Sequence, residues 1–427
     1  MTRFHTAREA LAWLERFTNY EKTPPKAKRT AYDLERMRAL CARLGHPEER
    51  FAAYHVTGTK GKGSTSHYLA AALGGGTGLY TSPHLVSMLE RIQVGGRAVS
   101  GKRFARAVSR VVGFARGGGG GIATFFELMT AAAFGIFAEC GVAVVEVGLG
   151  GRLDATNVLP SPVACGITSV DFDHMDRLGN TLEKIAAEKA GIIKPGTLVV
   201  TAEKKPGPLA VIRRAAARAG AELLEVGPDI RIRDARADRL DRWTATFELD
   251  GAPSTRVTLA TPGRHQLDNF AVAYGMLSAT VNVPPVRWPV AAATVVPGRQ
   301  QLFPGRPPVL LDVAHNPVSL RALSAHLARA FPRRRTVLVF GTSSDKDVAG
   351  NLKAILGAAD DVLFTQAPHP RAADALEMAR LARRGIVCPD PRKALATARD
   401  LAGPRGLVVV AGSFYVAGEV LPVLRRG

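Results

Sequence analysis

Short apolar runs alternate with helical patterns along most of this chain, and no other sequence feature constrains its fold as strongly. Residues 54–57, 142–147 and 163–169 are rich in β-branched side chains, which predicts buried parallel strands. A helical pattern at 64–73 follows the first run. Strands that alternate with helices form a parallel sheet whose faces the helices cover. The sequence therefore predicts an α/β protein.

The alternation breaks once, which indicates two domains. Three strand-like runs within 230–259 predict a small antiparallel patch on the first domain. A proline-rich stretch of low periodicity, 283–308, follows and places the domain boundary near Val296. We expect an N-terminal phosphate-loop ATPase-like domain over 1–296 and a smaller Rossmann-like domain over 297–427. The expected strands are 230–233, 243–249 and 254–259 in the patch and 309–312, 336–340, 361–365 and 407–411 in the second domain, whose expected helices are 319–330, 372–383 and 392–401.

The charge balance is strongly basic. Lys plus Arg total 57 against 37 for Asp plus Glu, a formal net charge of +20. This excess fits an anionic partner such as a nucleotide, and equally a compositional bias of the genome. The basic residues are scattered and no aromatic stripe accompanies them, so we expect no nucleic-acid partner.

Targeting and membrane signals are not expected. The apolar run 128–138 lies between Glu127 and Glu139, which predicts a buried helix and no membrane span. The first 17 residues have an amphipathic helical pattern with acidic residues, unlike a signal peptide. Four cysteines outside metal-finger spacing fit a reducing compartment. We expect a cytoplasmic protein, with the glycine run 117–121 as a flexible loop.

The strongest local motif is the glycine-rich run from Gly58 to Thr65, between a predicted strand and a predicted helix. Glycines let backbone N–H groups turn toward phosphate oxygens, and the helix N-terminus adds positive charge. Lys62 would reach the outer phosphates, and Ser64 or Thr65 would face Mg²⁺. The spacing departs from the strict phosphate-loop pattern because Gly63 follows Lys62. An ordinary strand–helix turn is the alternative.

Three further side chains could serve this motif. Glu146 ends a predicted strand and could bind Mg²⁺ beside the loop, or could simply be solvated. His174 follows the next strand and could be a metal ligand or a loop residue. Lys189 lies near the end of a predicted helix, where an exposed lysine usually complements the helix dipole.

The second domain has its own candidate. Asp312 and His315 follow a predicted strand, at the crevice where α/β domains bind ligands. Asn316 ahead of Pro317 also predicts a helix start, and the two interpretations are compatible.

Taken in order, these motifs resemble the folylpolyglutamate synthases, a family of Mur-type ATP-dependent amide ligases. The resemblance covers nearly the whole chain and indicates the bifunctional type that is also a dihydrofolate synthase. The motifs are 55–65, 81–85, 146–157, 173–174, 188–196, 265–266 with Asn269, 297–299, 312–317 and 345–347.

The resemblance implies a role for each matched residue. The metal ligands would be Ser82, Glu146, His174 and Lys189, the last carbamylated by CO₂ so that it carries a carboxylate. Lys62, Lys189 and His315 would be catalytic, and His315 and Ser413 would lie near the incoming glutamate. ATP would contact Thr59, Gly61, Lys62, Gly63, Ser64, Asn269, Arg299 and Asp312, and the folate would contact Thr124, Phe125, Phe126, Glu127, Leu153, Asp154 and Ala155.

The implied reaction activates a folate or dihydropteroate carboxylate with ATP and two Mg²⁺ ions, and L-glutamate then attacks the acyl phosphate. The two domains are expected to close around this intermediate and exclude water. We expect a monomer that acts on small-molecule substrates. The alternatives are a ligase of a cell-wall precursor, a basic nucleic-acid-binding ATPase and a non-catalytic nucleotide-binding regulator.

Overall fold

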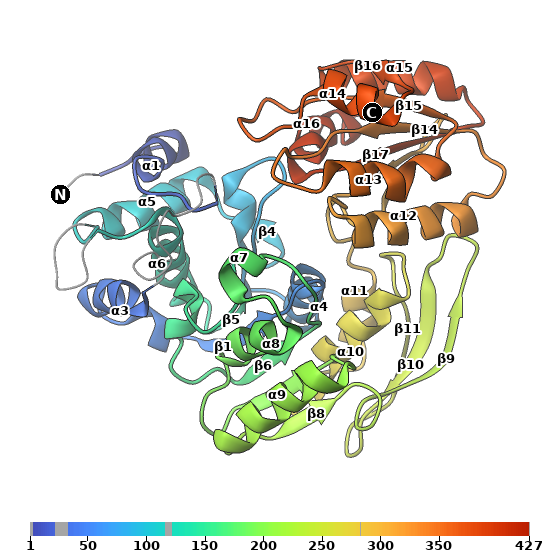
Figure 1. The fold of residues 1–427 in the computed structure, drawn as a ribbon. Helices are drawn as coiled ribbons and strands as arrows, with labels where there is room; N and C mark the ends of the chain where they lie inside the picture. The colour runs from blue at the N-terminus through green and yellow to red at the C-terminus, as the bar shows by residue number, and fades with distance from the viewer. Residues whose placement is uncertain (1–2, 22–32, 116–121, 282, 427) are drawn as a thin grey trace.

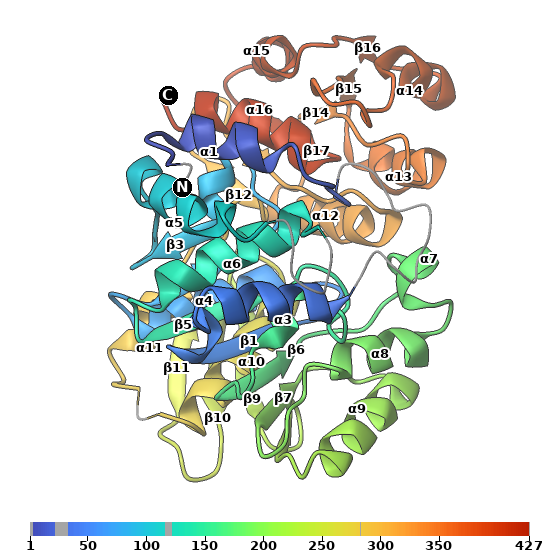
Figure 2. The same ribbon diagram turned by 90° about the vertical axis from the view of Figure 1, so that its left-hand side faces the viewer.

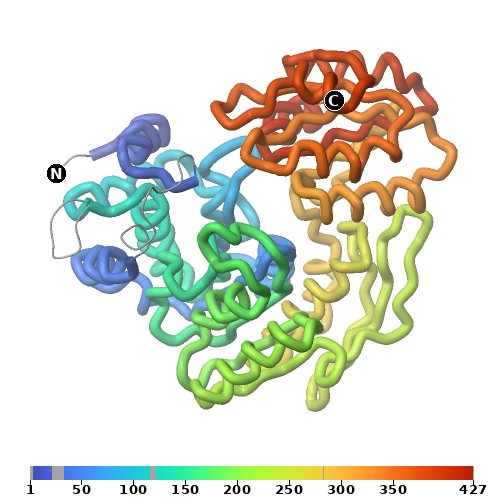
Figure 3. Tube along the Cα trace, in the orientation of Figure 1, coloured from blue at the N-terminus to red at the C-terminus, as the bar shows by residue number. Residues whose placement is uncertain are grey.

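The computed structural model describes residues 3–21, 33–115, 122–281 and 283–426. It contains two α/β domains, each built around its own sheet (Figure 1). The N-terminal domain precedes the C-terminal domain along the chain, as the colour gradient in Figure 3 shows. The glycine run 117–121 lies outside the described residues.

The N-terminal domain is organised by an eight-stranded sheet of order β4-β3-β2-β5-β1-β6-β7-β8. In sheet order, the six strands β2, β5, β1, β6, β7 and β8 pair in parallel. The strands β3 and β4 continue the sheet beyond β2 in antiparallel pairing. The parallel sheet predicted from the β-branched runs is confirmed. The strands are β1 Ala52–Thr57, β2 Gly78–Tyr80, β3 Ile92–Val94, β4 Arg97–Ala98, β5 Val142–Glu146, β6 Ala164–Ile167, β7 Leu198–Thr201 and β8 Leu223–Glu225.

Helices cover both faces of this sheet. One apolar cluster joins the sheet to α1, α3, α5 and α6, and another joins it to α4, α10 and α11. α8 and α9 pack side by side near the β7–β8 edge (Figure 2). The helices are α1 Ala7–Leu14, α3 Leu34–Arg43, α4 Lys62–Leu73, α5 Gly101–Val112, α6 Phe125–Phe137, α7 Met175–Leu178, α8 Leu182–Ala190, α9 Pro206–Arg218, α10 His265–Ser278 and α11 Arg287–Ala292, with 3₁₀ turns η1 Pro47–Glu49, η2 Met88–Arg91 and η3 Ala155–Val158.

The apolar run at 128–138 belongs to α6, whose residues are buried on nearly every side. The expected buried helix is confirmed. None of the helices in the described ranges combines the length and apolarity needed to cross a membrane.

The predicted antiparallel patch is a separate sheet of order β11-β10-β9. Its strands are β9 Arg231–Ala237, β10 Trp243–Glu248 and β11 Thr255–Thr258. β9 extends four residues beyond the predicted 230–233, because it pairs with β10 across a bulge near Thr244. The β9–β10 hairpin reaches up to the C-terminal domain (Figure 1).

The C-terminal domain has a six-stranded sheet of order β12-β13-β17-β14-β15-β16, in which only the β12–β13 pair is antiparallel. Apolar clusters fill both of its faces. The strands are β12 Gln301–Phe303, β13 Val309–Leu311, β14 Thr336–Phe340, β15 Asp361–Phe364, β16 Ile386–Val387 and β17 Leu407–Ala411; the helices are α12 Pro317–Ala330, α13 Val348–Ile355, α14 Ala375–Ala382, α15 Pro391–Ala402 and α16 Phe414–Leu424, with the 3₁₀ turn η4 Leu356–Ala358.

Some helix starts differ from the sequence prediction because caps decide them. α14 begins at Ala375 and not at 372, because the Asp374 side chain accepts a hydrogen bond from Glu377 N. α4 begins at Lys62, two residues before the predicted start, because Gly61 takes a left-handed φ of 90° and turns the chain directly into the helix. α12 begins at Pro317, two residues before the predicted range 319–330, and the predicted cap by Asn316 is confirmed, since its side chain accepts from Ser319 N.

Candidate active site

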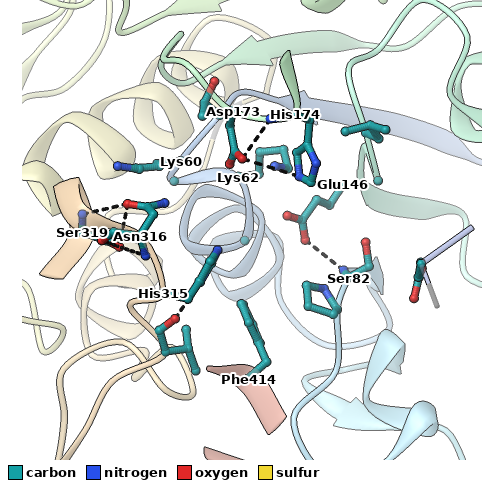
Figure 4. Close-up of a pocket in the computed structure, with 18 of the residues that line it drawn as sticks. Lys60, Lys62, Ser82, Glu146, Asp173, His174, His315, Asn316, Ser319 and Phe414 are labelled. Atoms are coloured by element: carbon teal, nitrogen blue, oxygen red, sulfur yellow. Dashed lines mark hydrogen bonds and ion pairs between the residues drawn. The ribbon is translucent and has the colours of Figure 1, made fainter. Parts of the chain in front are cut away.

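A cavity of about 1330 Å³ lies between the two domains and is lined by both. The N-terminal domain contributes the ends of β1, β5 and β6, and the C-terminal domain contributes the loops after β13 and β17. The carboxyl ends of parallel strands are where α/β folds bind ligands. Figure 4 shows Lys62, Glu146, Asp173 and His174 gathered on one side of the cavity, with His315 and Phe414 facing them.

The glycine-rich loop joins β1 to α4 along this cavity. Thr59, Gly61, Lys62, Gly63 and Ser64 all line it. The α4 N-terminus therefore opens toward the cavity, which is the geometry that binds phosphate. The Lys62 ammonium donates a hydrogen bond of 3.0 Å to the carbonyl of residue 58 at the base of the loop.

The loop is braced by Asn269 from α10. A Cβ on Gly61 would lie 2.1 Å from Asn269 Oδ1, so no side chain fits there. Thr65 Oγ1 donates a hydrogen bond of 3.0 Å to the Asn269 carbonyl. Asn269 Nδ2 in turn donates to Gln266 Oε1 at 3.0 Å. The structure thus brings Asn269 to the phosphate loop, where it lines the cavity with the other predicted ATP contacts.

Glu146 is the last residue of β5 and is only 4% exposed, so the alternative of a solvated strand end is wrong. Its Oε2 accepts a hydrogen bond of 3.1 Å from the backbone N–H of Ser82. Burial raises the pKa of Glu146 to about 7, and the nearby Lys62 ammonium opposes that rise. The carboxylate is held against the phosphate loop, where a cation would stabilise its charged form.

Lys189, on α8, is only 2% exposed. The expectation of an exposed lysine that complements the helix dipole is wrong, because α8 packs this side of its last turn inward. Burial, together with repulsion from Lys62, lowers the pKa of Lys189 to about 7. The amine therefore spends part of its time neutral near pH 7, the form that reacts with CO₂. It lies behind the cavity wall and does not line the cavity.

His174 caps α7 in a left-handed conformation with φ 48°. Its side chain is 45% exposed, and Nε2 lies 3.8 Å from Asp173 Oδ1. Burial of the ring, against the attraction of Asp173, lowers the pKa of His174, which favours the neutral imidazole that binds metals. It lines the cavity on the same side as Glu146 (Figure 4).

These residues fit a hard divalent cation. The buried Glu146 carboxylate and the Ser82 hydroxyl offer oxygen ligands beside the phosphate loop, the donor type that Mg²⁺ prefers. The raised pKa of Glu146 shows that the protein alone does not fully stabilise its charge. Lys189 would add a third oxygen donor only as its carbamate.

The C-terminal domain presents a loop held by Asp312. Its carboxylate accepts hydrogen bonds from Gln300 N at 2.8 Å and from Ala314 N at 2.6 Å. Asp312 therefore ties the segment that carries Arg299 to the loop that carries His315, and all three side chains line the cavity. The Arg299 guanidinium lies 5.2 Å from the centre of the Phe414 ring.

His315 points its imidazole into the cavity (Figure 4). Nδ1 lies 2.8 Å from the Val313 carbonyl, so Nδ1 carries the proton that it donates there. Burial lowers the pKa of His315, and the ring is therefore neutral near pH 7 with Nε2 as an acceptor. Ser413 also lines the cavity, but its hydroxyl caps α16 by accepting from Val416 N at 3.0 Å.

Six of the seven predicted folate residues line the cavity. Thr124 and Glu127 form the capping box of α6, and Arg36 pairs with Glu127 at 3.0 Å. Asp154 caps η3 and accepts from Leu149 N at 2.9 Å, and burial raises its pKa. Phe125 faces the apolar core and does not line the cavity. The members that do line it are Thr124, Phe126, Glu127, Leu153, Asp154 and Ala155.

Several lining residues had no predicted role. His369 stacks on Tyr415, with ring centres 3.7 Å apart, and Arg371 donates a hydrogen bond of 2.7 Å to the Tyr415 hydroxyl. Arg91 of η2 is 2% exposed and makes a two-fold hydrogen bond with Glu21. Tyr415 could have been found because it follows the end of β17, whereas the Arg91–Glu21 pair spans 70 residues without a sequence signal.

Comparison with known proteins gives the family. The Mur ligase middle domain matches residues 56–277, and the Mur ligase glutamate ligase domain matches 298–414. The dihydrofolate synthase/folylpolyglutamate synthase of Bacillus subtilis is 33% identical over 408 residues, which cover 91% of this chain and 94% of that protein.

Solved structures agree. The E. coli FolC complex with DHPP and ADP matches with a TM-score of 0.85 and 29% identity, over 98% of each chain. The bifunctional folylpolyglutamate synthase/dihydrofolate synthase of Yersinia pestis, complexed with AMPPNP and Mn ion, matches with a TM-score of 0.84 and 28% identity, over 100% of each chain. This chain therefore belongs to the Mur ligase family of ATP-dependent amide ligases, among the dihydrofolate synthase/folylpolyglutamate synthases.

Proposed function

We propose that this chain joins L-glutamate to a folate, and also to dihydropteroate, at the expense of ATP. One observation carries the proposal: the buried carboxylate of Glu146 lies beside a phosphate loop, in a cavity that the loop of His315 faces from the other domain. The relatives that share this fold include structures with ADP, with AMPPNP and Mn ion, and with DHPP.

The residues that would hold Mg²⁺ are Ser82, Glu146 and His174, together with Lys189 as its carbamate. We propose two ions shared among them. Mg²⁺ would neutralise the phosphates so that a carboxylate can approach the γ-phosphorus. The lowered pKa of Lys189 supports carbamate formation, because only the neutral amine attacks CO₂.

The phosphate loop would bind and orient ATP. The N–H groups at the start of α4 point to the phosphates, and the Lys62 ammonium supplies a positive charge at the outer phosphate. The folate carboxylate would enter from the end lined by Phe126 and Asp154. Its oxygen attacks the γ-phosphorus, ADP leaves, and an acyl phosphate forms.

The C-terminal domain would bring the second nucleophile. The neutral His315, with Nε2 as an acceptor, is suited to hold the ammonium of L-glutamate or to take its proton. The amine attacks the acyl carbon, phosphate leaves, and an amide forms. Arg299 and Asp312 would position ATP from the linker side, and Ser413 would lie near the glutamate.

Water must be kept from the acyl phosphate, which fits a site shared between two domains. We place the boundary between these domains near Val296, ahead of the first strand of the second sheet, β12. We propose that the chain acts as a monomer on small molecules.

The test is release of ADP by the purified chain with ATP, Mg²⁺ and L-glutamate, comparing dihydropteroate with tetrahydrofolate as acceptor. Release with both acceptors establishes a bifunctional enzyme. Release with tetrahydrofolate alone removes the dihydrofolate synthase activity from the proposal, and release with dihydropteroate alone removes the polyglutamate synthase activity. No release with either acceptor overturns the proposal and directs the search to cell-wall precursors.

A further inference from the structure

The two domains meet at a second place, away from the cavity and from the linker. The turn between β9 and β10 lies against α12 of the C-terminal domain (Figure 1). Leu240 of this turn packs against the C-terminal apolar cluster that includes Leu323 and Leu327 of α12. A piece of the N-terminal domain is therefore part of the C-terminal core.

Asp241 is the polar centre of this contact. It is 1% exposed and has a left-handed φ of 58°. Its Oδ2 lies 3.2 Å from Nδ1 of His326, which is itself 2% exposed, and its Oδ1 lies 3.2 Å from Nε of Arg329. Both partners belong to α12. The Trp243 indole of β10 is the third partner and donates a hydrogen bond of 3.0 Å to Oδ1.

A carboxylate buried this deeply needs such partners, because an unpaired charge in a protein interior is strongly unfavourable. Two of the three partners come from the other domain. Sliding or rotating α12 away from the hairpin would leave Asp241 with Trp243 alone. The contact is therefore selective for one relative position of the two domains.

The same residue is also joined to the nucleotide side of the site. The Asp241 carbonyl accepts a hydrogen bond of 3.0 Å from Gly263 N. Pro262 and His265, on either side of this glycine, line the cavity. At its other end α12 begins directly after His315 and Asn316, which also line the cavity. Asp241 thus connects one wall of the site with the helix that carries the opposite wall.

We propose that Asp241 is a positioning residue for the ligation reaction. By fixing α12 to the segment 261–266, it sets the orientation in which the His315 loop meets the phosphate loop. This inference rests on the proposed function for its kinetic consequences, but the contact itself does not depend on the substrate.

The experiment compares Asp241→Asn with Asp234→Asn in the full chain. Asp234 is a matched control because it lies on the same hairpin, also has a left-handed φ, at 51°, and is 74% exposed, with its nearest partner Arg256 in the same sheet. Asparagine tolerates this backbone conformation at both sites. Each variant is assayed for KM of ATP, KM of L-glutamate, and the ratio of ADP released to glutamate incorporated.

For Asp241→Asn we expect KM for L-glutamate to rise about five-fold or more, the size of a typical coupling between sites. KM for ATP should rise less than KM for L-glutamate, because the phosphate loop lies in the N-terminal domain and only Arg299 and Asp312 approach ATP from the other side. The ratio of ADP to incorporated glutamate should rise, because a loosely placed second domain lets water reach the acyl phosphate. Asp234→Asn should match the parent chain in all three.

A role limited to stability would lower the melting temperature and the amount of active protein while leaving both KM values and the ratio unchanged, and that result overturns the proposal.

If Asp241→Asn fails to fold, Arg329→Gln takes its place, because this side chain is 52% exposed. Arg329→Lys keeps the positive charge, so its KM for L-glutamate should lie between the values of the parent chain and of Arg329→Gln. Where Asp241→Asn folds, the double variant Asp241→Asn/Arg329→Gln should raise KM for L-glutamate no further than Asp241→Asn does, since Arg329→Gln removes a contact that Asp241→Asn has already weakened.

Small-angle X-ray scattering with AMPPNP and Mg²⁺ separates this proposal from the proposed function. If the parent chain ligates no glutamate, the proposed function fails and the scattering decides alone. A broader distribution of inter-domain distances in Asp241→Asn, absent in Asp234→Asn, supports the positioning role. Identical scattering from all three proteins overturns it.

Discussion

The carboxylate of Glu146 lies against the backbone of Gly63, at a distance where a Cβ on the glycine would be 3.7 Å from Oε2. The end of β5 and the start of α4 therefore share one small space, which holds an acidic side chain and a phosphate-binding helix end together. The helix end attracts anions and the carboxylate attracts cations, so a divalent ion between them would join the carboxylate to the phosphates of a nucleotide.

Replacing Glu146 with glutamine tests this relationship. Loss of the carboxylate should lower kcat by about 100-fold or more, as expected for removing a group that stabilises the transition-state charge. Binding of Mn²⁺, followed by electron paramagnetic resonance with AMPPNP present, should weaken as well. Glu139→Gln is the control, because Glu139 is 57% exposed on the far end of α6. Unchanged Mn²⁺ binding in Glu146→Gln would remove Glu146 from the metal site.

The same variant should be more stable than the parent chain in metal-free buffer at pH 8. Burial raises the folded-state pKa of Glu146 to about 7, above its usual 4.5. The folded chain therefore holds a proton that the unfolded chain has lost between these values, and stability falls as the pH rises through this window. The gain in melting temperature of Glu146→Gln should be larger at pH 8 than at pH 4.5. A gain that is equal at both pH values contradicts the assignment.

Gly61→Ala should disable the phosphate loop. Gly61 has a φ of 90°, and an added Cβ would collide with Asn269 at 2.1 Å. We expect the KM for ATP to rise about ten-fold or more, because a small displacement of loop N–H groups weakens every phosphate contact. Gly75→Ala, at the end of the same helix, has open space around the added Cβ and should behave as the parent chain. Equal KM values in the two variants would show that the loop tolerates the shift.

Lys189→Met should stabilise the chain in a pH-dependent way. The folded-state pKa of Lys189 is about 7 against a usual 10.5. Below pH 7 the folded chain therefore buries a charged ammonium, and the loss of stability from that burial is greatest. Between pH 7 and 10.5 the folded chain releases the proton that the unfolded chain keeps, and stability rises with pH. In CO₂-free buffer the increase in melting temperature over the parent chain should therefore be larger at pH 6 than at pH 9.

Lys184→Met, an exposed lysine on the same helix, should show no such difference. Activity of the parent chain should also fall in CO₂-free buffer and return when bicarbonate is added. Activity that does not respond to CO₂ removal would leave Lys189 as a buried lysine with no carbamate.

Asp154→Ala should affect the acceptor end of the cavity. The Asp154 carboxylate accepts hydrogen bonds from Leu149 N, Thr156 N and Thr156 Oγ1, and so holds the loop that lines the predicted pterin pocket. We expect about 1 kcal/mol of lost stability, as for other cap replacements. The kcat/KM for dihydropteroate should fall more than that for tetrahydrofolate. Asp33→Ala, which removes the side-chain cap from α3, should cost similar stability without changing this preference.

The regular part of the fold could be predicted from the sequence. β14 and β17 span the predicted residues, because each is a β-branched run buried on both faces. α16 was missed because apolar residues also lie outside its buried stripe, which hides the amphipathic period, and because Pro422 interrupts the helical sequence. α11 was missed for a similar reason, since it lies in the proline-rich stretch and contains Pro289.

The candidate site was predictable where chemistry follows a strand end. Glu146, Asp312 and the loop around Lys62 all have this position. The burial of Lys189 was not predictable, because position on a helix fixes the direction of a side chain and not what packs over it. The contact between Asp241 and His326 joins residues 85 apart, and only tertiary structure brings them together.

The hairpin turn that enters the C-terminal core limits how the domains can be exchanged between relatives. A chimaera cut at the linker near Val296 would place a foreign α12 against the native Leu240 and Asp241. Recombination would therefore have to move the turn at 238–242 together with the C-terminal domain, although the two segments lie far apart along the chain. In this protein the unit of modular exchange is discontinuous in sequence.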